Sequence, residues 1–203
     1  MDELEYLEEN RSDEYDKAIV FIHGWKGNKD SFTSLSSILK IKNAKWFFPQ
    51  APYRISDTKY SWSFQHSDQS WEYKEPIRLL NKFLNDKILN HLESKNVFFI
   101  GFSQGATVCY DLVLQLEYAW GGVFPVSGFT RDKDREFTIH KNQFKTPIII
   151  GHGLMDDIVP ITSSERIFQD LNKKSFNVSF EKFNGGHKIS IDYLKKIQTI
   201  ISG

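Results

Sequence analysis

The sequence is poor in features that would define a function by themselves. It has one cysteine, Cys109, among 203 residues, so it can form neither an internal disulfide nor a thiolate metal site. Its 26 Lys and Arg balance its 26 Asp and Glu, which leaves no net field to attract nucleic acid or an anionic membrane surface. No apolar run approaches the roughly 18 residues of a membrane span. We therefore expect no nucleic-acid partner, no membrane span and a small or neutral substrate.

The start of the chain, MDELEYLEEN, is acidic. It lacks the basic start and apolar run of a secretory signal, so we expect a cytoplasmic protein. Apolar residues make up 40% of the chain and aromatic residues 15%, enough for one substantial core. The expectation is a single domain over residues 1–203.

Short apolar runs bounded by Gly, Pro or Ser recur along the chain and have the character of strands. They begin at Lys17, Lys45, Asn96, Gly121, Thr146 and Ser175. The first five suit strands buried on both faces, whereas the last, SFNVSFEKF, is more polar and is predicted nearer the edge.

Stretches with helical spacing lie between these runs. They are Glu75 to Ser94, Gln104 to Tyr118, Ser163 to Asn172 and Ser190 to Ile201. Alternating strands and helices predict an α/β fold, with a mostly parallel twisted sheet and helices on both faces. The segment Gln50 to Glu72 does not fit this alternation. A loop of this length is usually either functional or disordered. Its Tyr, Trp and Phe residues favour an ordered flap.

The strongest chemical motif is Gly101-Phe102-Ser103-Gln104-Gly105, which follows a predicted strand and precedes a predicted helix. This is the pattern of a nucleophile elbow, in which a tight turn exposes a serine hydroxyl and glycines prevent steric clashes. The alternative is a serine that only caps the helix. The context of strand, turn and helix favours Ser103 as a nucleophile.

A serine hydroxyl needs a base to take its proton, and histidine has a suitable pKa. In folds with this elbow the partners follow in the order Ser, Asp or Glu, His. His187 is the one histidine that follows an acidic loop after the elbow, so we predict it as the base. The orienting carboxylate is expected in the turn GHGLMDDIVP, where Asp156 and Asp157 compete and composition does not separate them.

Acyl transfer also needs donors for the oxyanion, usually the N–H after the nucleophile and another from a loop after an early strand. These donors are predicted to be the backbone N–H groups of Gln104 and Trp25, the latter within the glycine-rich sequence HGWKGN.

The chain resembles the carboxylesterase/phospholipase group of α/β-hydrolases, which includes acyl-protein thioesterases. The resemblance runs from Val20 to His187 and depends on six blocks in order, FIHGWKGN, FPQAPYR, SWSF, GFSQGA, GHGLMDDIVP and GGH. It implies the α/β-hydrolase fold, a Ser-His-Asp triad and no cofactor. The implied substrates are short or medium acyl esters, thioesters of acylated proteins or lysophospholipids. The family pattern H-G-x-x-D-x-x-V-P implies Asp156 rather than Asp157.

The resemblance also guides expectations for the cleft. Lys26 stands where many relatives have a glycine or another small residue. Little sequence between Gly121 and Pro147 remains for a lid, so we expect a minimal lid and an open cleft beside the aromatic flap. Trp25, Trp62 and Phe102 are the predicted pocket residues.

Other functions stay open at this point. The same fold could serve a non-catalytic module that binds an acyl ligand or a protein, and the triad could perform peptidase or perhydrolase chemistry. A zinc hydrolase is disfavoured because the histidines lack ligand spacing. The oligomeric state is not defined by the sequence, although the aromatic flap could equally form a homodimer contact.

Overall fold

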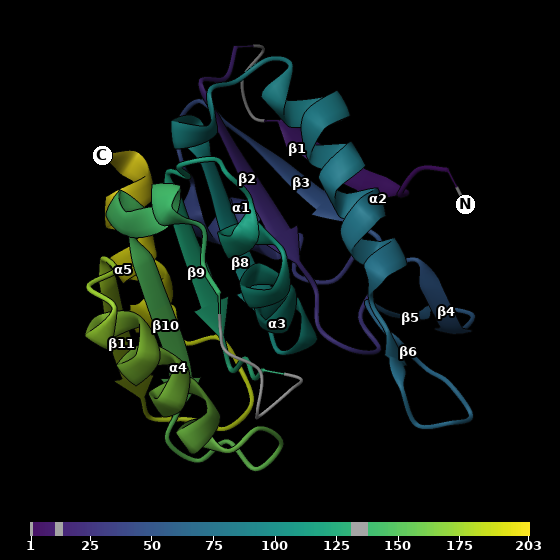
Figure 1. Ribbon diagram of the computed structural model, residues 1–203. Helices are drawn as coiled ribbons and strands as arrows, with labels where there is room; N and C mark the ends of the chain where they lie inside the picture. The colour runs from purple at the N-terminus through teal and green to yellow at the C-terminus, as the bar shows by residue number, and fades with distance from the viewer. Residues whose placement is uncertain (1, 11–13, 131–137) are drawn as a thin grey trace.

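The computed structural model describes residues 2–10, 14–130 and 138–203 (Figure 1). A seven-stranded sheet in the order β1-β3-β2-β8-β9-β10-β11 forms its centre. Every neighbouring pair is parallel except β1 and β3. The strands are β1 (Tyr6–Asn10), β2 (Lys17–Ile22), β3 (Ala44–Pro49), β8 (Val97–Phe102), β9 (Gly122–Val126), β10 (Ile148–Gly153) and β11 (Val178–Phe183).

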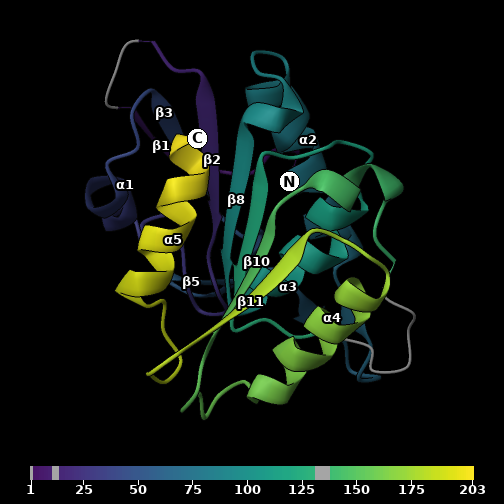
Figure 2. The same cartoon turned by 90° about the vertical axis from the view of Figure 1, so that its left-hand side faces the viewer.

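Helices cover both faces of this sheet (Figure 2). One face packs against α2 (Lys74–Leu84), α3 (Gln104–Asp111) and α4 (Ile161–Lys173), and the other against α1 (Ser34–Leu39) and α5 (Ile191–Ser202). This confirms the predicted mostly parallel sheet with helices on both faces. Among the described residues, no helix is both long and apolar enough to cross a membrane.

The alternation of side chains along β2 explains why Ala18 to Ile22 are all apolar. Val20 and Ile22 join the core beneath α2, α3 and α4, whereas Ile19 and Phe21 join the core beneath α1 and α5. Successive side chains of a strand point to opposite faces of the sheet, so a central strand between two helical layers needs apolar residues at every position. All six predicted runs form strands, and the more polar β11 lies at the edge as expected.

Two predicted helices end earlier than the sequence pattern suggested. The helix expected from Glu75 ends as α2 at Leu84 and continues as a π-helical segment, Asn85–Leu89. The helix α3 ends at Asp111, and a 3₁₀ segment, Val113–Gln115, follows. Backbone carbonyls in that segment accept hydrogen bonds from distant residues instead of from a continuing helix: the ring N–H of Trp120 donates to Val113 O at 2.8 Å, for example.

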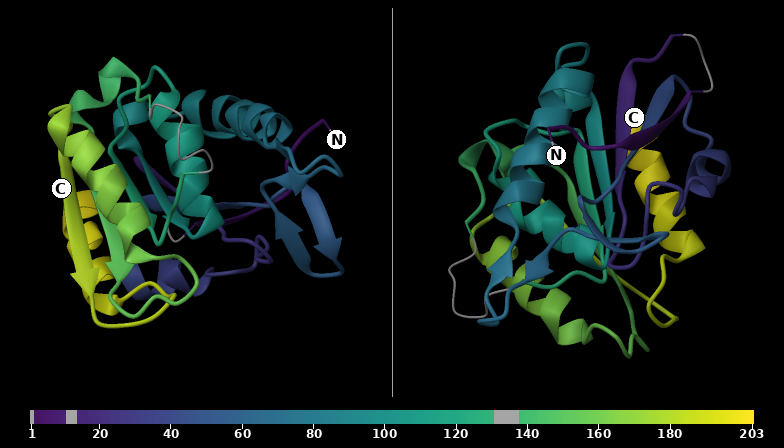
Figure 3. Two further views of the ribbon diagram at one scale, coloured as in Figure 1. Left: turned by 60° about the horizontal axis from the view of Figure 1, so that its bottom comes forward. Right: turned by 90° about the vertical axis from the view of Figure 1, so that its right-hand side faces the viewer.

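The aromatic segment after β3 is an ordered flap, which we define as residues 50–72. It contains two small antiparallel hairpins. The first pairs β4 (Tyr53–Ser56) with β5 (Lys59–Ser61), and the second pairs β6 (Phe64–Gln65) with β7 (Trp71–Glu72). The flap lies by the N-terminal end of α2, at the side of the molecule (Figures 1 and 3). The minimal lid was predicted partly on residues 131–137, which lie outside the described residues.

Candidate active site

The turn that bears Ser103 has the strained geometry of a nucleophile elbow. Ser103 lies between β8 and α3 with φ 54° and ψ −116°, a region that residues other than glycine seldom adopt. Its backbone N–H donates to Val126 O at 2.9 Å, which ties the turn to β9. The chain packs so closely that a Cβ at Gly105 would lie 2.0 Å from Ile22 O, and one at Gly101 would lie 2.5 Å from the carbonyl oxygen of residue 105. Both glycines of the motif are therefore required by close approach.

The structure brings His187 and Asp156 together from two loops after β10 and β11. The ring nitrogen Nδ1 of His187 lies 2.8 Å from Asp156 Oδ2. This contact leaves Nε2 as the ring nitrogen available to a serine. The Asp156 side chain is fully buried, whereas that of His187 is 18% exposed, so the pair has one face toward solvent and one toward protein.

Asp156 is held as a carboxylate by backbone donors. Its Oδ1 accepts the N–H groups of Ile158 at 3.0 Å and Val159 at 2.9 Å. Burial by itself would raise the pKa of Asp156, but the hydrogen bonds from Val159 and His187 outweigh it and lower the pKa below its usual value. Asp157 is exposed. The geometry thus distinguishes two aspartates that composition did not.

His187 lies against Phe102, the residue before Ser103. The rings of Phe102 and His187 lie 4.8 Å apart between centroids, and Phe102 directly precedes the serine in the chain. Among the described residues, no hydrogen bond joins Ser103 Oγ to His187. Catalytic hydrogen bonds are often long in ligand-free enzymes and shorten when substrate binds.

The two predicted oxyanion donors lie on segments that meet at the elbow. A Cβ at Gly24 would lie 3.2 Å from Ser103 Cβ, so the loop that continues to Trp25 passes directly over the serine. Within the described part of the chain, the backbone N–H groups of Trp25 and Gln104 have no hydrogen-bond acceptor. Lys26 adopts φ 63°, a left-handed conformation that favours glycine. Lys26 therefore adopts the backbone conformation that suits the glycine found in many relatives at this position.

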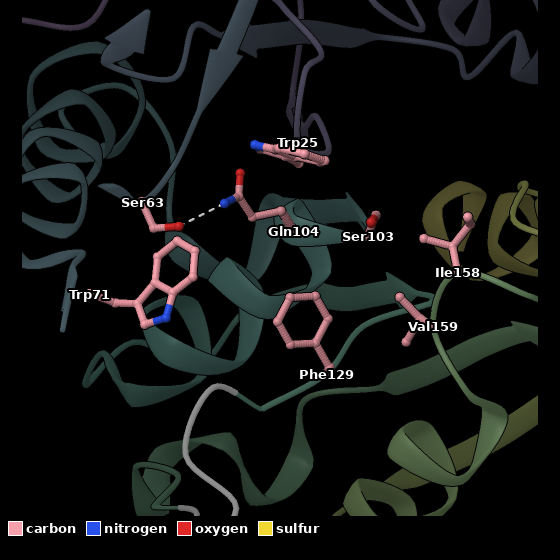
Figure 4. Close-up of a pocket in the computed structure, with 8 residues that line it drawn as sticks. All are labelled: Trp25, Ser63, Trp71, Ser103, Gln104, Phe129, Ile158 and Val159. Carbon is pink, nitrogen blue, oxygen red and sulfur yellow. Dashed lines mark hydrogen bonds between the residues drawn. The ribbon is translucent and has the colours of Figure 1, made fainter. Parts of the chain in front are cut away.

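A cavity of about 390 Å³ opens beside the elbow (Figure 4). It is lined by Trp25, Ser63, Trp71, Ser103, Gln104, Phe129, Ile158 and Val159. Of the predicted pocket residues, Trp25 lines the cavity, whereas Trp62 and Phe102 do not. Trp62 is fully buried and donates its ring N–H to His23 O at 2.9 Å, and Phe102 packs against His187 and Phe32.

Five cavity residues were not singled out from the sequence. Ser63, Ile158 and Val159 lie within the blocks SWSF and GHGLMDDIVP, whereas Trp71 and Phe129 lie outside the six blocks. Trp71 lies within the aromatic flap that we had singled out, but its residue type and position do not distinguish it from Trp62. Phe129 is held by Thr107, whose hydroxyl donates to Phe129 O at 2.8 Å. That contact joins residues 22 positions apart, and no local pattern predicts it.

Two other histidines near the site are structural. His23 is buried, which lowers its pKa to about 4. Its Nδ1 donates to Gly24 O at 2.8 Å and its Nε2 accepts the Ala51 N–H at 3.1 Å. Burial also lowers the pKa of His152, whose Nε2 lies 2.9 Å from Val159 O. Both rings therefore stabilise the loops around the site as neutral groups. The described residues contain no group of three or more His, Cys, Asp or Glu that could hold a metal ion.

The fold and its similarity to known proteins define an α/β-hydrolase of the esterase and thioesterase class. The chain belongs to the phospholipase/carboxylesterase family, whose model matches residues 7–203. This confirms the family resemblance inferred from the six sequence blocks.

Similar proteins are found among both sequences and structures. Acyl-protein thioesterase 1 of Kluyveromyces lactis is 26% identical over 209 residues, covering 91% of this chain and 90% of that protein. Carboxylesterase SOBER1 of Arabidopsis thaliana is 26% identical over 204 residues, covering 90% and 88%. The crystal structure of esterase PE8 superimposes with a TM-score of 0.85 over 98% of each chain, at 20% identity. At that identity the structural likeness supports the fold alone.

Proposed function

We propose that this protein hydrolyses carboxylic esters or thioesters, with Ser103 as nucleophile, His187 as general base and Asp156 as the residue that orients His187. The observation that supports this most directly is the 2.8 Å contact between His187 Nδ1 and Asp156 Oδ2. The His187 ring also packs against Phe102, which precedes a serine on a strained turn. A buried carboxylate in this position holds the imidazole in one tautomer and stabilises the imidazolium as it forms.

The proposed reaction has two steps. Ser103 Oγ attacks the carbonyl carbon while His187 Nε2 takes its proton, and the carbonyl oxygen gains negative charge beside the Trp25 and Gln104 N–H groups. The tetrahedral intermediate expels the alkoxide or thiolate, which receives the proton from His187, and an acyl-enzyme remains. Water then attacks the acyl-enzyme while His187 takes its proton. The second tetrahedral intermediate releases the carboxylic acid, and His187 returns the proton to Ser103 Oγ.

The size and lining of the cavity favour an acyl substrate of short to medium length. Its volume of about 390 Å³ lies toward the lower end of the range for small-molecule sites. Trp25, Trp71, Phe129, Ile158 and Val159 give it a largely apolar lining, and none of the described residues that line it is acidic or basic. The similar proteins named as acyl-protein thioesterase and carboxylesterase support ester and thioester substrates.

The test is the variant Ser103→Ala, assayed with p-nitrophenyl esters of increasing acyl length and with a parallel thioester series. Loss of the nucleophile should lower kcat by about 10⁴-fold or more and abolish labelling by a fluorophosphonate probe. The matched control is Ser202→Ala at the exposed end of α5, which should keep full activity. Near-normal turnover by Ser103→Ala would refute the assignment, and wild-type protein that neither turns over nor labels would favour a binding module.

A further inference from the structure

The side chain of Gln104 is bound by the flap through every polar atom it has. Its Oε1 accepts the backbone N–H of Trp62 at 2.9 Å. Its Nε2 donates to Ser61 Oγ at 3.0 Å and to Ser63 Oγ at 2.8 Å, and Figure 4 marks the bond to Ser63. Gln104 is only 7% exposed, so these bonds replace water rather than compete with it.

The orientation of this amide is fixed by its partners. A flipped amide would direct its NH₂ group at the Trp62 N–H, placing two donors against each other. The Ser61 hydroxyl donates to Ser63 O at 2.7 Å, so Ser61 Oγ acts as the acceptor for Gln104 Nε2 and for the Ser63 N–H. Each partner can therefore be satisfied in one arrangement, and such fully satisfied buried networks are rigid.

The same stretch of the flap also binds the loop of the other oxyanion donor. The Lys26 N–H donates to Tyr60 O at 2.9 Å, and the Tyr60 N–H donates to Gly27 O at 3.0 Å. The Trp62 ring N–H donates to His23 O. Residues 60–63, which we call the clamp, thus contact the chain on both sides of Trp25 as well as the Gln104 side chain.

From these contacts we propose that the Gln104 side chain is a positioning residue, which acts through the clamp to hold the two oxyanion donors at a fixed separation. This inference rests on the proposed serine mechanism. Gln104 supplies one donor from its own backbone N–H, and its anchored side chain restrains the direction of that N–H. Because the clamp binds the Trp25 loop at the same time, the two donors are set relative to each other.

The chemistry at the site favours a neutral anchor. Oxyanion donors act on charge that develops only in the transition state, so a carboxylate beside them would oppose that charge. A glutamine provides two donors and an acceptor without net charge. Its role predicts a specific kinetic effect: loss of the anchor should lower kcat and leave KM nearly unchanged, because binding of the ground state does not use the oxyanion donors.

The experiment compares Gln104→Met with wild type, using p-nitrophenyl acetate as the substrate. Methionine has nearly the same length and volume, keeps the backbone N–H and removes all three side-chain hydrogen bonds. A shift of the donors should lower kcat 10- to 100-fold, within the range for losing or misplacing one donor, with KM changed by less than about 2-fold. The matched control is Gln115→Met, whose side chain makes one bond to Tyr110 O away from the cavity.

Ser63→Ala removes one acceptor of the same hydrogen-bond network on the flap and leaves Gln104 intact. It should lower kcat in the same direction but less, and its effect should be much smaller in the Gln104→Met background, because coupled residues are not additive. This variant also tests the proposal if Gln104→Met fails to fold, which circular dichroism would reveal.

The possible results distinguish failure of the positioning role of Gln104 from failure of the serine mechanism. An unchanged kcat for acetate in both variants, or a rise in KM for longer esters alone, would overturn the positioning role while leaving the serine mechanism in place. Additive effects in the double variant would also overturn it. If Ser103→Ala retains activity, the proposed function itself fails, whatever the Gln104 variants do.

Discussion

Replacing Asp156 by asparagine should abolish most activity while leaving the fold intact. Asparagine has the same shape, and its Oδ1 can still accept the N–H groups of Ile158 and Val159, which bind that oxygen in the native protein. Its NH₂ group then faces His187 Nδ1, where the native Oδ2 lies at 2.8 Å. Two donors oppose each other there, so the histidine changes tautomer and carries its proton on Nε2.

The size of the effect follows from that tautomer. A protonated Nε2 cannot take the proton of Ser103, and the same exchange in a serine protease triad lowers kcat by about 10⁴-fold. At 1.36 kcal/mol for each factor of ten, this is about 5 kcal/mol in the activation barrier. The free energy of unfolding should change by less than about 1 kcal/mol, because both backbone hydrogen bonds to Oδ1 are kept.

The assay is steady-state hydrolysis of a p-nitrophenyl ester, with urea unfolding as the stability check. The matched control is Asp157→Asn. This substitution removes the same charge one residue away, at a side chain that is exposed. It should keep activity within about 2-fold, because surface substitutions have small effects. Equal losses in the two variants, or a larger loss in Asp157→Asn, would refute the role that we assign to Asp156.

Two further predictions concern stability. Gly105→Ala should destabilise the protein by about 3 kcal/mol or more, since its Cβ would lie 2.0 Å from Ile22 O. In the control Gly186→Ala the new Cβ would meet its nearest atom at 3.4 Å, so the loss should be less than about 1 kcal/mol. Equal free energies of unfolding in urea for the two variants would contradict this. Burial lowers the pKa of His23 to about 4 in the folded protein. In the unfolded chain this histidine binds a proton below about pH 6.5. The free energy of unfolding should therefore not depend on His23 above that pH, and should fall by about 3 kcal/mol as the pH is lowered to about 4. In His23→Asn this part of the pH dependence should vanish. An identical pH profile for the variant and the wild type would exclude His23 as its source.

The central sheet was predictable because burial on both faces leaves a strong mark on the sequence. Strand β2 is apolar at each position that enters either core, and the glycine, proline and serine residues beside such runs define their ends. Strand β1 was not predicted. Its sequence, YLEEN, is only partly buried, and it forms by antiparallel pairing with β3, in which Tyr6 lies opposite Pro49. Such an edge strand depends on a tertiary partner more than on its own pattern.

The order of motifs pointed to Ser103 and His187, but residue type alone misassigned part of the pocket. Trp62 and Trp71 both lie in the aromatic flap, and the sequence gives no sign of which ring faces the cavity. The backbone hydrogen bonds of the flap turn Trp62 inward, where its ring N–H reaches His23 O, and leave Trp71 49% exposed at the cavity. The side a residue faces in an irregular segment is set by contacts that lie far away in the sequence.

Gln104 shows the same limit at a residue that the motif did identify. The elbow pattern implicates its backbone N–H, but the partners of its side chain lie 41 and 43 residues upstream, beyond any local signal. The flap therefore has two parts with different expected effects. Residues 61–63 contact the Gln104 side chain, which we propose to act on the transition state, whereas Trp71 lines the cavity where an acyl chain would bind. Substitutions in the first part should act on kcat, and those in the second on KM for long acyl chains, because only the first part is bonded to the groups that face the developing charge.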